Sequence, residues 1–211
     1  MGLLDILFDP DGFFKVEVEE KKPIYRGLTV VLLSAFLSAV ISSITSPAMA
    51  KAIYRFMLSK SVSPEVAKTI ASTVKLSVVL SPLIVIVSWL LVSAILYGIS
   101  ALFGGNGDFS DTLKVVAYSF IPGIVVFPFK LYIAIQEAKA LETLGLSSLS
   151  GFRDAAVILN LAVLAWQFML WRYGIKHARK LSSRDATIVA GILTIALVAL
   201  TLYGLFNHKN F

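Results

Sequence analysis

Cysteine is absent from the 211-residue sequence, and charged residues are scarce. The lack of cysteine excludes disulfides, thiolate catalysis and cysteine-ligated zinc or iron–sulfur sites. Asp, Glu, Lys and Arg make up 15% of the residues, against about 25% in a typical soluble domain. Motifs of phosphate-binding loops, serine hydrolases and zinc peptidases are also missing, as are acidic residues at metal-ligand spacing from a histidine. The sequence therefore predicts a non-enzymatic protein without a cofactor or metal.

Apolar residues, in contrast, form 57% of the sequence and gather in long runs. About 20 apolar residues in a helix cross the hydrocarbon core of a bilayer. We predict an all-α polytopic membrane protein, a bundle of five transmembrane helices with a Pro-kinked third span and short interfacial helices. Residues 1–26 would form an amphipathic head and residues 207–211 a tail, on either side of a membrane domain at 27–206. The expected spans are residues 27–45, 76–103, 112–136, 154–173 and 186–206.

The head and the basic segment 172–184 supply the candidate contacts with lipid or protein partners. We expect Pro10 to end a first interfacial turn and Asp11-Gly12 to form a tight turn. The two phenylalanines that follow should dock as anchors at the membrane interface or on the bundle. The net charge is +6 and most basic residues flank apolar runs, so anionic headgroups suit them better than nucleic acid does. The contact candidates are Pro10, Phe13, Phe14, Lys176, His177, Arg179 and Lys180.

The segments between spans carry helix boundaries of their own. Pro47 is expected to end the first span, because proline removes a helix hydrogen bond. Residues 46–75 then form the longest polar connection, with a helix beginning at Ser63-Pro64-Glu65. Residues 137–153 are expected to be a small-residue loop with an interfacial helical turn. Ser182 and Asp185 have the spacing of a capping box before the fifth span.

The third span follows a glycine-rich turn at 104–107 and is interrupted by Pro122, Gly123 and Pro128. Pro122 cannot donate to the carbonyl of Tyr118, so we expect a bend between residues 118 and 123. One interpretation is a kinked helix with a packing role. The other is a break that lines a site or allows movement, as in some transporters.

Polar side chains inside the predicted spans leave two interpretations open. Lys130 lies near a span end, where its long stem reaches the headgroups, or else marks an ion or substrate site. Asn160 and Gln167 are seven residues apart and share a helix face, which favours an interhelical hydrogen bond. Together with the broken third span, these residues motivate an alternative function, a small transporter or channel.

Three stretches resemble the Yip-domain family of five-span membrane proteins, whose eukaryotic members are named for interacting with Ypt/Rab GTPases. They are FDPDGFF at 8–14, GNGDFSDTLKVVAYSFIP at 105–122 and WQFMLWRYGIKHARKLSSRDA at 166–186. Their order and spacing cover most of the chain. The resemblance implies a non-enzymatic protein, with a cytoplasmic N-terminus, that acts through lipids, self-association and protein partners.

This chain departs from the eukaryotic members of that family. It has a short head in place of their long cytoplasmic N-terminal region, and the head lacks their Asp-Leu-Tyr-Gly-Pro element. The departure argues against GTPase binding and resembles the prokaryotic form. Because eukaryotic members act in vesicle trafficking and membrane shaping, the resemblance favours a membrane-organising or trafficking-related scaffold.

Five spans would place the two termini on opposite sides of the membrane. Lys and Arg divide almost evenly between the two sides, so their number does not choose an orientation. The strongly basic segment 172–184 precedes the fifth span, whereas the tail after that span carries a single lysine. We therefore predict a multi-pass protein of the cell membrane with a cytoplasmic N-terminus and an external C-terminus.

Overall fold

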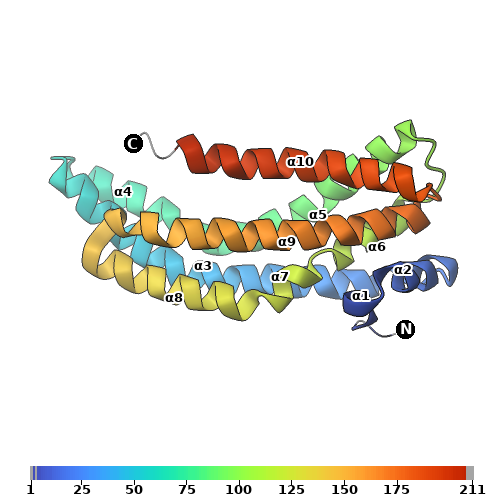
Figure 1. The fold of residues 1–211 in the computed structure, drawn as a ribbon. Coiled ribbons are helices and arrows are strands. Elements are labelled where there is room, and N and C mark those ends of the chain that lie inside the picture. Colours follow the sequence, from blue (N-terminus) through green and yellow to red (C-terminus); the bar gives the residue numbers. More distant parts are fainter. Residues whose placement is uncertain (1, 3, 208–211) are drawn as a thin grey trace. The chain divides into compact units, whose positions relative to one another are not determined.

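The fold is helical almost throughout in a computed structural model, which describes residue 2 and residues 4–207 (Figure 1). Within these residues there is no strand. The helices are α1 (Asp5–Phe8), α2 (Pro10–Glu19), α3 (Tyr25–Ser59), α4 (Pro64–Val74), α5 (Ser77–Leu102), α6 (Phe109–Tyr118), α7 (Ile121–Val125), α8 (Phe127–Leu144), α9 (Leu149–Ala178) and α10 (Ser183–Asn207). A 3-10 turn, η1 (Gly145–Ser148), joins α8 to α9.

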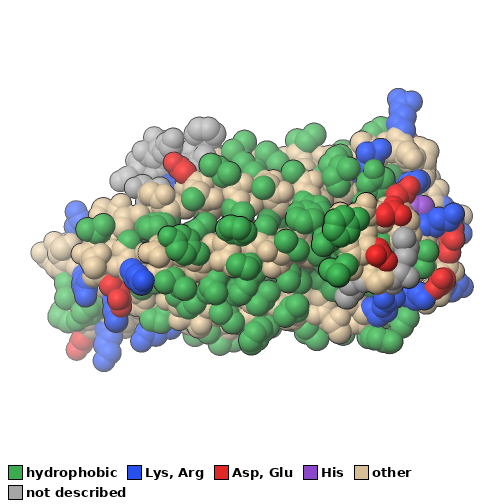
Figure 2. Space-filling view, turned by 60° about the horizontal axis from the view of Figure 1, so that its bottom comes forward, with side chains coloured by type: hydrophobic (Ala, Val, Ile, Leu, Met, Phe, Trp, Pro, Cys, Tyr) green, Lys and Arg blue, Asp and Glu red, His purple; other side chains and the backbone are tan. Residues whose placement is uncertain are grey.

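Four stretches are long and apolar enough to cross a membrane: Tyr25–Ser59, Pro64–Leu102, Gly151–Ala178 and Ser183–Gly204. A fifth candidate is the bent pair Phe109–Val125 and Phe127–Ser148, which passes the same test only when its two parts are taken together. Apolar side chains cover much of the visible face in Figure 2, as suits helices surrounded by lipid. The prediction of an all-α, multi-pass membrane protein is thus confirmed at this level.

The chain divides into two compact units. Unit 1 consists of Met1–Leu32, Ile86–Pro122 and Asn160–Phe211. Unit 2 consists of Leu33–Val85 and Gly123–Leu159. Because the long helices α3 and α9 each continue from one unit into the other, the units are not consecutive stretches of sequence.

Unit 2 is held by small apolar residues and a few polar contacts. Ala48 and Ala52 of α3 pack with Leu141 of α8 in a buried cluster. The hydroxyls of Ser46 and Ser77 are hydrogen bonded to each other. Glu142 accepts from Lys51 Nζ at 2.9 Å, and its backbone carbonyl accepts from Arg55 Nη1 at 2.7 Å. Alanine allows these helices to approach closely, as membrane helices generally require.

Two prolines were assigned the wrong role from the sequence. Pro47 does not end the first helix but lies inside α3, which continues to Ser59. Proline removes only its own helix hydrogen bond, and the alanines that follow it favour the helix. Pro10 does not end a turn, and Asp11-Gly12 is helical. Instead Pro10 is the first residue of α2, where its fixed φ suits the helix, and Asp9 caps that helix by accepting from Gly12 N at 3.0 Å.

The connections between spans are also more helical than predicted. Most of residues 46–75 belong to α3 and α4, and α4 begins at Pro64 as the Ser-Pro-Glu signal indicated. Most of residues 137–153 belong to α8, η1 and α9 rather than to a loop. The predicted capping box before α10 is confirmed, because Asp185 N donates to Ser182 Oγ at 3.1 Å and Ser182 Oγ donates to Asp185 Oδ2 at 2.7 Å.

The third span is interrupted twice. Helix α6 ends at Tyr118, a turn at residues 119–120 follows, and α7 holds Pro122 and Gly123. A second interruption at Val126 precedes α8, in which Pro128 occupies the first turn. The first interruption falls in the predicted region, but its attribution to Pro122 stays a prediction.

Candidate functional site

Three polar segments that are distant in sequence meet at one end of unit 1. They are residues 4–24 of the head, the loop formed by residues 103–108, and the connection formed by residues 179–182. Lys114 Nζ of α6 donates to the carbonyl of Lys22 in the head at 3.0 Å. The loop joins the connection, because Asn106 N donates to the carbonyl of Arg179 at 2.9 Å. Together these segments form the candidate site, which we call the polar end of unit 1.

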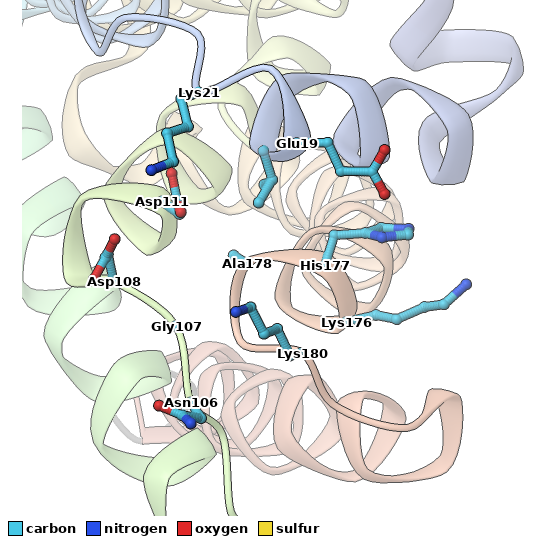
Figure 3. Close-up of a pocket in the computed structure, with 11 residues that line it drawn as sticks. Glu19, Lys21, Asn106, Gly107, Asp108, Asp111, Lys176, His177, Ala178 and Lys180 are labelled. Carbon is cyan, nitrogen blue, oxygen red and sulfur yellow. The ribbon is translucent and has the colours of Figure 1, made fainter.

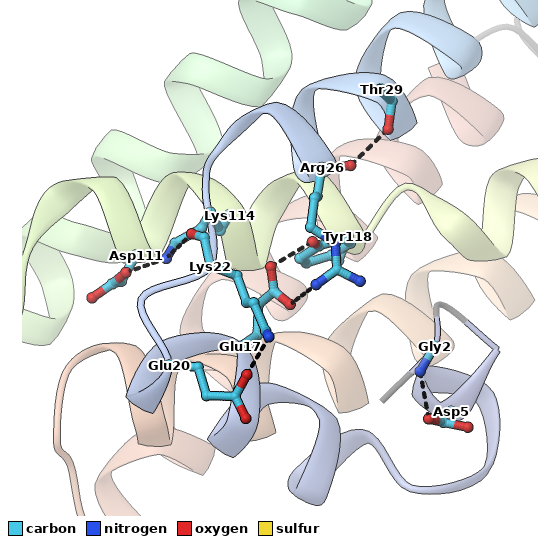
Figure 4. Close-up of polar contacts among 10 residues, drawn as sticks. All are labelled: Gly2, Asp5, Glu17, Glu20, Lys22, Arg26, Thr29, Asp111, Lys114 and Tyr118. Carbon is cyan, nitrogen blue, oxygen red and sulfur yellow. Dashed lines mark hydrogen bonds and ion pairs between the residues drawn. The ribbon is translucent and has the colours of Figure 1, made fainter.

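A buried carboxylate holds helix α2 against α6. Glu17 is only 3% exposed. Tyr118 Oη donates to Glu17 Oε1 at 2.7 Å, and Arg26 Nη1 donates to Glu17 Oε2 at 3.2 Å (Figure 4). A buried charge is tolerated when it is both paired and hydrogen bonded, and Glu17 meets both conditions. The pairing therefore fixes the head in one position on unit 1.

Aromatic packing adds to this attachment. Phe13 and Phe14 are 1% and 0% exposed, and the ring centroid of each lies 5.1 Å and 6.3 Å, respectively, from that of Tyr118. The rings meet edge to face, an arrangement that aromatic pairs prefer. Of the two expected positions, the membrane interface and the bundle, Phe13 and Phe14 take the second, because both are buried within unit 1.

Lys114 is a second buried charge at this end, being 4% exposed. Its ammonium pairs with Asp111 Oδ1 at 2.6 Å as well as with the Lys22 carbonyl. Lys114 thus ties the turn after α2 to α6, about one helical turn before Tyr118 in the same helix.

Asp11 links α2 to the last turn of α9. Its carboxylate accepts from Lys176 Nζ at 2.9 Å and lies 2.6 Å from His177 Nε2. Burial acts to raise the pKa of Asp11, but the hydrogen bonds and charges of Lys176 and His177 outweigh it and hold this pKa below 3.8. The carboxylate therefore stays ionised, and Lys176 and His177 serve as partners of the head.

Arg179 is buried, with 2% of its surface exposed, and it holds the loop at 103–108. Its guanidinium donates to the carbonyl of Gly107, to the carbonyl of Gly105 at 2.6 Å and to Ser100 Oγ at 2.9 Å. It also lies 4.0 Å from the ring centroid of Tyr97. Within the described residues no carboxylate pairs with it. Its burial corrects the prediction that Arg179 contacts headgroups or partners.

The loop can approach so closely only because it contains glycine. A Cβ atom on Gly107 would lie 1.8 Å from the carbonyl oxygen of Ala178, far inside van der Waals contact. The glycine-rich stretch predicted a turn. Only the structure shows why glycine is needed at position 107, which is the close approach of the loop to the end of α9.

A pocket of about 620 Å³ opens among these segments. Lining residues come from the end of the head, the loop, α6 and the end of α9 (Figure 3). They are Val18, Glu19, Lys21, Asn106, Gly107, Asp108, Asp111, Lys176, His177, Ala178 and Lys180. Lys176, His177 and Lys180 are thus the predicted contact residues that border this pocket.

The residues predicted as hinge or bundle-polar do not form one site. Gln167 Nε2 donates to the carbonyl of Ser119, at the first interruption of the third span, at 3.0 Å. Asn160 was expected to face the bundle interior but is exposed. Lys130 is half-buried and belongs to unit 2. The polar end of unit 1 includes Tyr118 from this group, but neither Asn160 nor Lys130.

Sequence reasoning missed most of the charged residues that build the site. Asp11, Glu17 and Arg26 lie in the polar head and Lys114 lies at the start of the expected third span, and none of them was expected to be a site residue. No local pattern distinguishes Glu17 from Glu19 and Glu20, which are exposed. The alternation of Val and Glu in VEVEE was the only available signal, and it does not identify a buried carboxylate in a helix.

Comparison with known proteins gives one positive result. A model of the Yip1 domain matches residues 4–205. The comparisons with curated proteins and with solved structures found no match. The match spans the head, all the candidate membrane helices and the polar end of unit 1, in agreement with the motif resemblance. The chain therefore belongs to the Yip1 domain family of membrane proteins.

Proposed function

We propose that this protein is a non-enzymatic membrane-organising or trafficking-related scaffold that acts through lipid contacts, self-association and protein partners. The observation that carries the proposal is the use of charge at the polar end of unit 1. Asp11, Glu17, Lys114 and Arg179 all bind segments of the chain to one another. Such contacts hold the head, the loop and the connection in fixed positions at the end of the helices, as a surface that binds other molecules requires.

The proposal includes five membrane spans, the fifth being the broken pair of α6–α7 and α8. The loop at 103–108 is tied to Arg179, at the C-terminal end of α9. If the candidate span in α9 crosses the membrane, its first residue and Ala178 lie on opposite sides. The chain must then cross once between residues 108 and 149, which makes the broken pair a span and the total five.

The same contacts support an orientation. The head, the loop and the connection at 179–182 share one side, because Asp11, Lys22 and Asn106 each contact residues near the ends of α6 or α9. We place this side in the cytoplasm of a cell-membrane protein and the C-terminus outside. The orientation rests on the basic segment 172–184. Lys180 is then available near anionic headgroups, beside Lys176 and His177, which are paired with Asp11.

Gln167 bears on the alternative of a transporter or channel. At the first interruption of the third span, the carbonyl of Ser119 is already occupied by Gln167 Nε2. If the third span lined a conduit, a carbonyl left without its helix partner at the interruption would face water or a solute instead of a side chain. The contact therefore favours a broken helix that packs, and it supports the scaffold over transport.

Two measurements on the reconstituted full chain test the function. Flux of sodium, potassium and protons should not exceed that of empty liposomes. Single-molecule photobleaching in vesicles should show more than one copy per spot at protein densities where a monomeric control membrane protein shows one. Selective flux above background, together with strictly single copies, would replace the scaffold by the transport alternative.

A further inference from the structure

We infer that the pocket at the polar end of unit 1 binds a zwitterionic phosphate ester of the phosphoethanolamine type. This site is an addition to the scaffold role and does not depend on it. Its volume, about 620 Å³, falls in the range of small-molecule sites, roughly 300 to 1,000 Å³. The pocket also lies where candidate spans end at Ala178 and begin at Ser183, which is the level of lipid headgroups.

The first observation concerns two lysines on the pocket wall. Lys21 and Lys180 have φ of 46° and 55°, in the left-handed region that favours glycine. Both follow a helix C-terminus and close it, because Lys22 N donates to Glu17 O at 3.2 Å and Leu181 N to Lys176 O at 3.0 Å. Glycine would avoid the strain in both places. Ser61, after α3 and outside the pocket, ends its helix in the same way, so the conformation alone does not mark a site. What distinguishes the pocket is that both of its residues in this conformation are lysines.

The second observation is that these two cations have no ion-pair partner among the residues that the structure describes. Lys176 is engaged by Asp11, whereas neither Lys21 nor Lys180 forms an ion pair within the described part of the chain. In Figure 3 the amines of Lys21 and Lys180 point toward the pocket from its two sides. Asn106 adds an amide on the same wall. Two ammonium groups and an amide suit the oxygens of a phosphate.

The acidic residues decide which kind of phosphate fits. Asp108 and Asp111 line the pocket opposite Lys180 (Figure 3). Asp108 caps α6 without a side-chain hydrogen bond, so its carboxylate is available. Asp111 is paired with Lys114, so Asp108 supplies the negative charge that a ligand would meet. A simple phosphate would be repelled by Asp108, and a simple cation by the lysines. A ligand with a phosphate and a primary ammonium satisfies both, and its N–H groups can donate to Asp108.

The experiment compares lipids that differ by one feature. The full chain is reconstituted in bilayers with equal amounts of phosphatidylethanolamine, phosphatidylcholine and phosphatidylglycerol, and native mass spectrometry counts the lipids retained. Phosphatidylcholine keeps the charges but lacks N–H donors, and phosphatidylglycerol lacks the ammonium. We expect retention of phosphatidylethanolamine over both by about tenfold, the size of a charge-assisted hydrogen bond.

Variants assign the effect to the pocket. Lys21→Gln with Lys180→Gln should abolish the preference, whereas Lys15→Gln with Lys68→Gln, which removes the same charge from exposed positions outside the pocket, should keep it. Asp108→Asn retains a capping residue and should remove only the preference over phosphatidylglycerol. This second variant keeps the test valid if the double lysine variant does not fold.

Soluble ligands separate the two sources of the chemistry. If O-phosphoethanolamine raises the thermal stability of the detergent-solubilised protein while no lipid is selectively retained, the ligand is a free phosphate ester and the assignment of the pocket holds. The inference is overturned if inorganic phosphate stabilises as well as O-phosphoethanolamine does. It is also overturned if wild type shows neither a lipid preference nor stabilisation by O-phosphoethanolamine, or if the pocket variants match the Lys15 and Lys68 control.

Discussion

Glu17 shows how one side chain can decide the position of a whole segment. It is buried between α2, α3 and α6, and it accepts hydrogen bonds from Tyr118 and Arg26. Tyr118 is fully buried, whereas the side chain of Arg26 is 26% exposed. Removal of the carboxylate would therefore leave the Tyr118 hydroxyl buried without this partner and Arg26 without its ion pair, whereas a change at exposed Glu19 would do neither.

Glu17→Ala should lower the free energy of unfolding in detergent by about 3 kcal/mol or more, since it breaks a buried pair. Tyr118→Phe should cost less, about 1 to 3 kcal/mol, because Arg26 still pairs with Glu17. Glu19→Ala is the matched control and should change stability by less than about 0.5 kcal/mol. Denaturant titrations followed by tryptophan fluorescence measure these differences. Equal effects of Glu17→Ala and Glu19→Ala would show that the buried pairing does not hold the head.

Asp11 gives a pH dependence with a definite sign. Its pKa is lowered in the folded protein, where hydrogen bonds from Lys176 and His177 outweigh the effect of burial. The contribution of Asp11 to stability is therefore complete above its unfolded pKa of about 4, and it is lost as pH falls through the lower folded pKa. The site is 41% exposed, so we expect at most about 1 kcal/mol.

Wild type should accordingly be slightly more stable than Asp11→Asn at pH 7 and pH 5, and the difference should begin to shrink below about pH 4 and vanish below the folded pKa of Asp11. Thermal unfolding of both proteins in the same detergent, at matched ionic strength, measures the difference. A difference that grew toward acidic pH would mean that the ionised form of Asp11 is not the one that the fold stabilises.

Helix α2 is the element through which the head joins unit 1. It buries Phe13 and Phe14 against Tyr118 while Lys15, the next residue, faces outward. The sequence indicated an amphipathic segment in this region. It could not indicate whether the aromatic face meets lipid or protein, because both are apolar surroundings for a phenyl ring.

Phe13→Ser with Phe14→Ser should release α2 and increase cleavage within residues 4–22 by an added protease. Each large-to-small change at a buried Phe costs about 3 to 5 kcal/mol, more than such a short segment can lose while it stays docked. Lys15→Ser is the control and should be cleaved at the wild-type rate. Unchanged cleavage kinetics in the double variant would contradict the docking of α2.

At the scale of the whole molecule, the arrangement of spans follows from contacts among distant segments. The loop at 103–108 and the connection at 179–182 are held together by Arg179 and Asn106. Because the loop and the connection lie on the same side, the number of spans can be tested by finding on which side residues between α8 and α9 lie. The absence of native cysteine allows single cysteines to be introduced without background.

We expect cysteines at Asn106 and Ser183 to be protected from an impermeant thiol reagent in intact cells, and a cysteine at Ser147 to be labelled. All three positions are exposed in the structure. Labelling after permeabilisation is the control for reactivity. If Asn106 and Ser147 are labelled from the same side, the broken pair re-enters the membrane without crossing it and the number of spans is four.

The sequence by itself determined the composition-driven properties: helical secondary structure, membrane spans, the start of α4, the capping box of α10 and the family. These depend on hydropathy and on local hydrogen bonding, which neighbouring residues control. It did not determine the continuation of α3 through Pro47 or the helical state of Asp11-Gly12, because a proline signal is the same at a helix start, interior or end.

Only the tertiary structure decided that Glu17, Lys114 and Arg179 are buried while Asn160 is exposed. The reason is that burial of a charge depends on partners about a hundred residues away, and no local pattern encodes them.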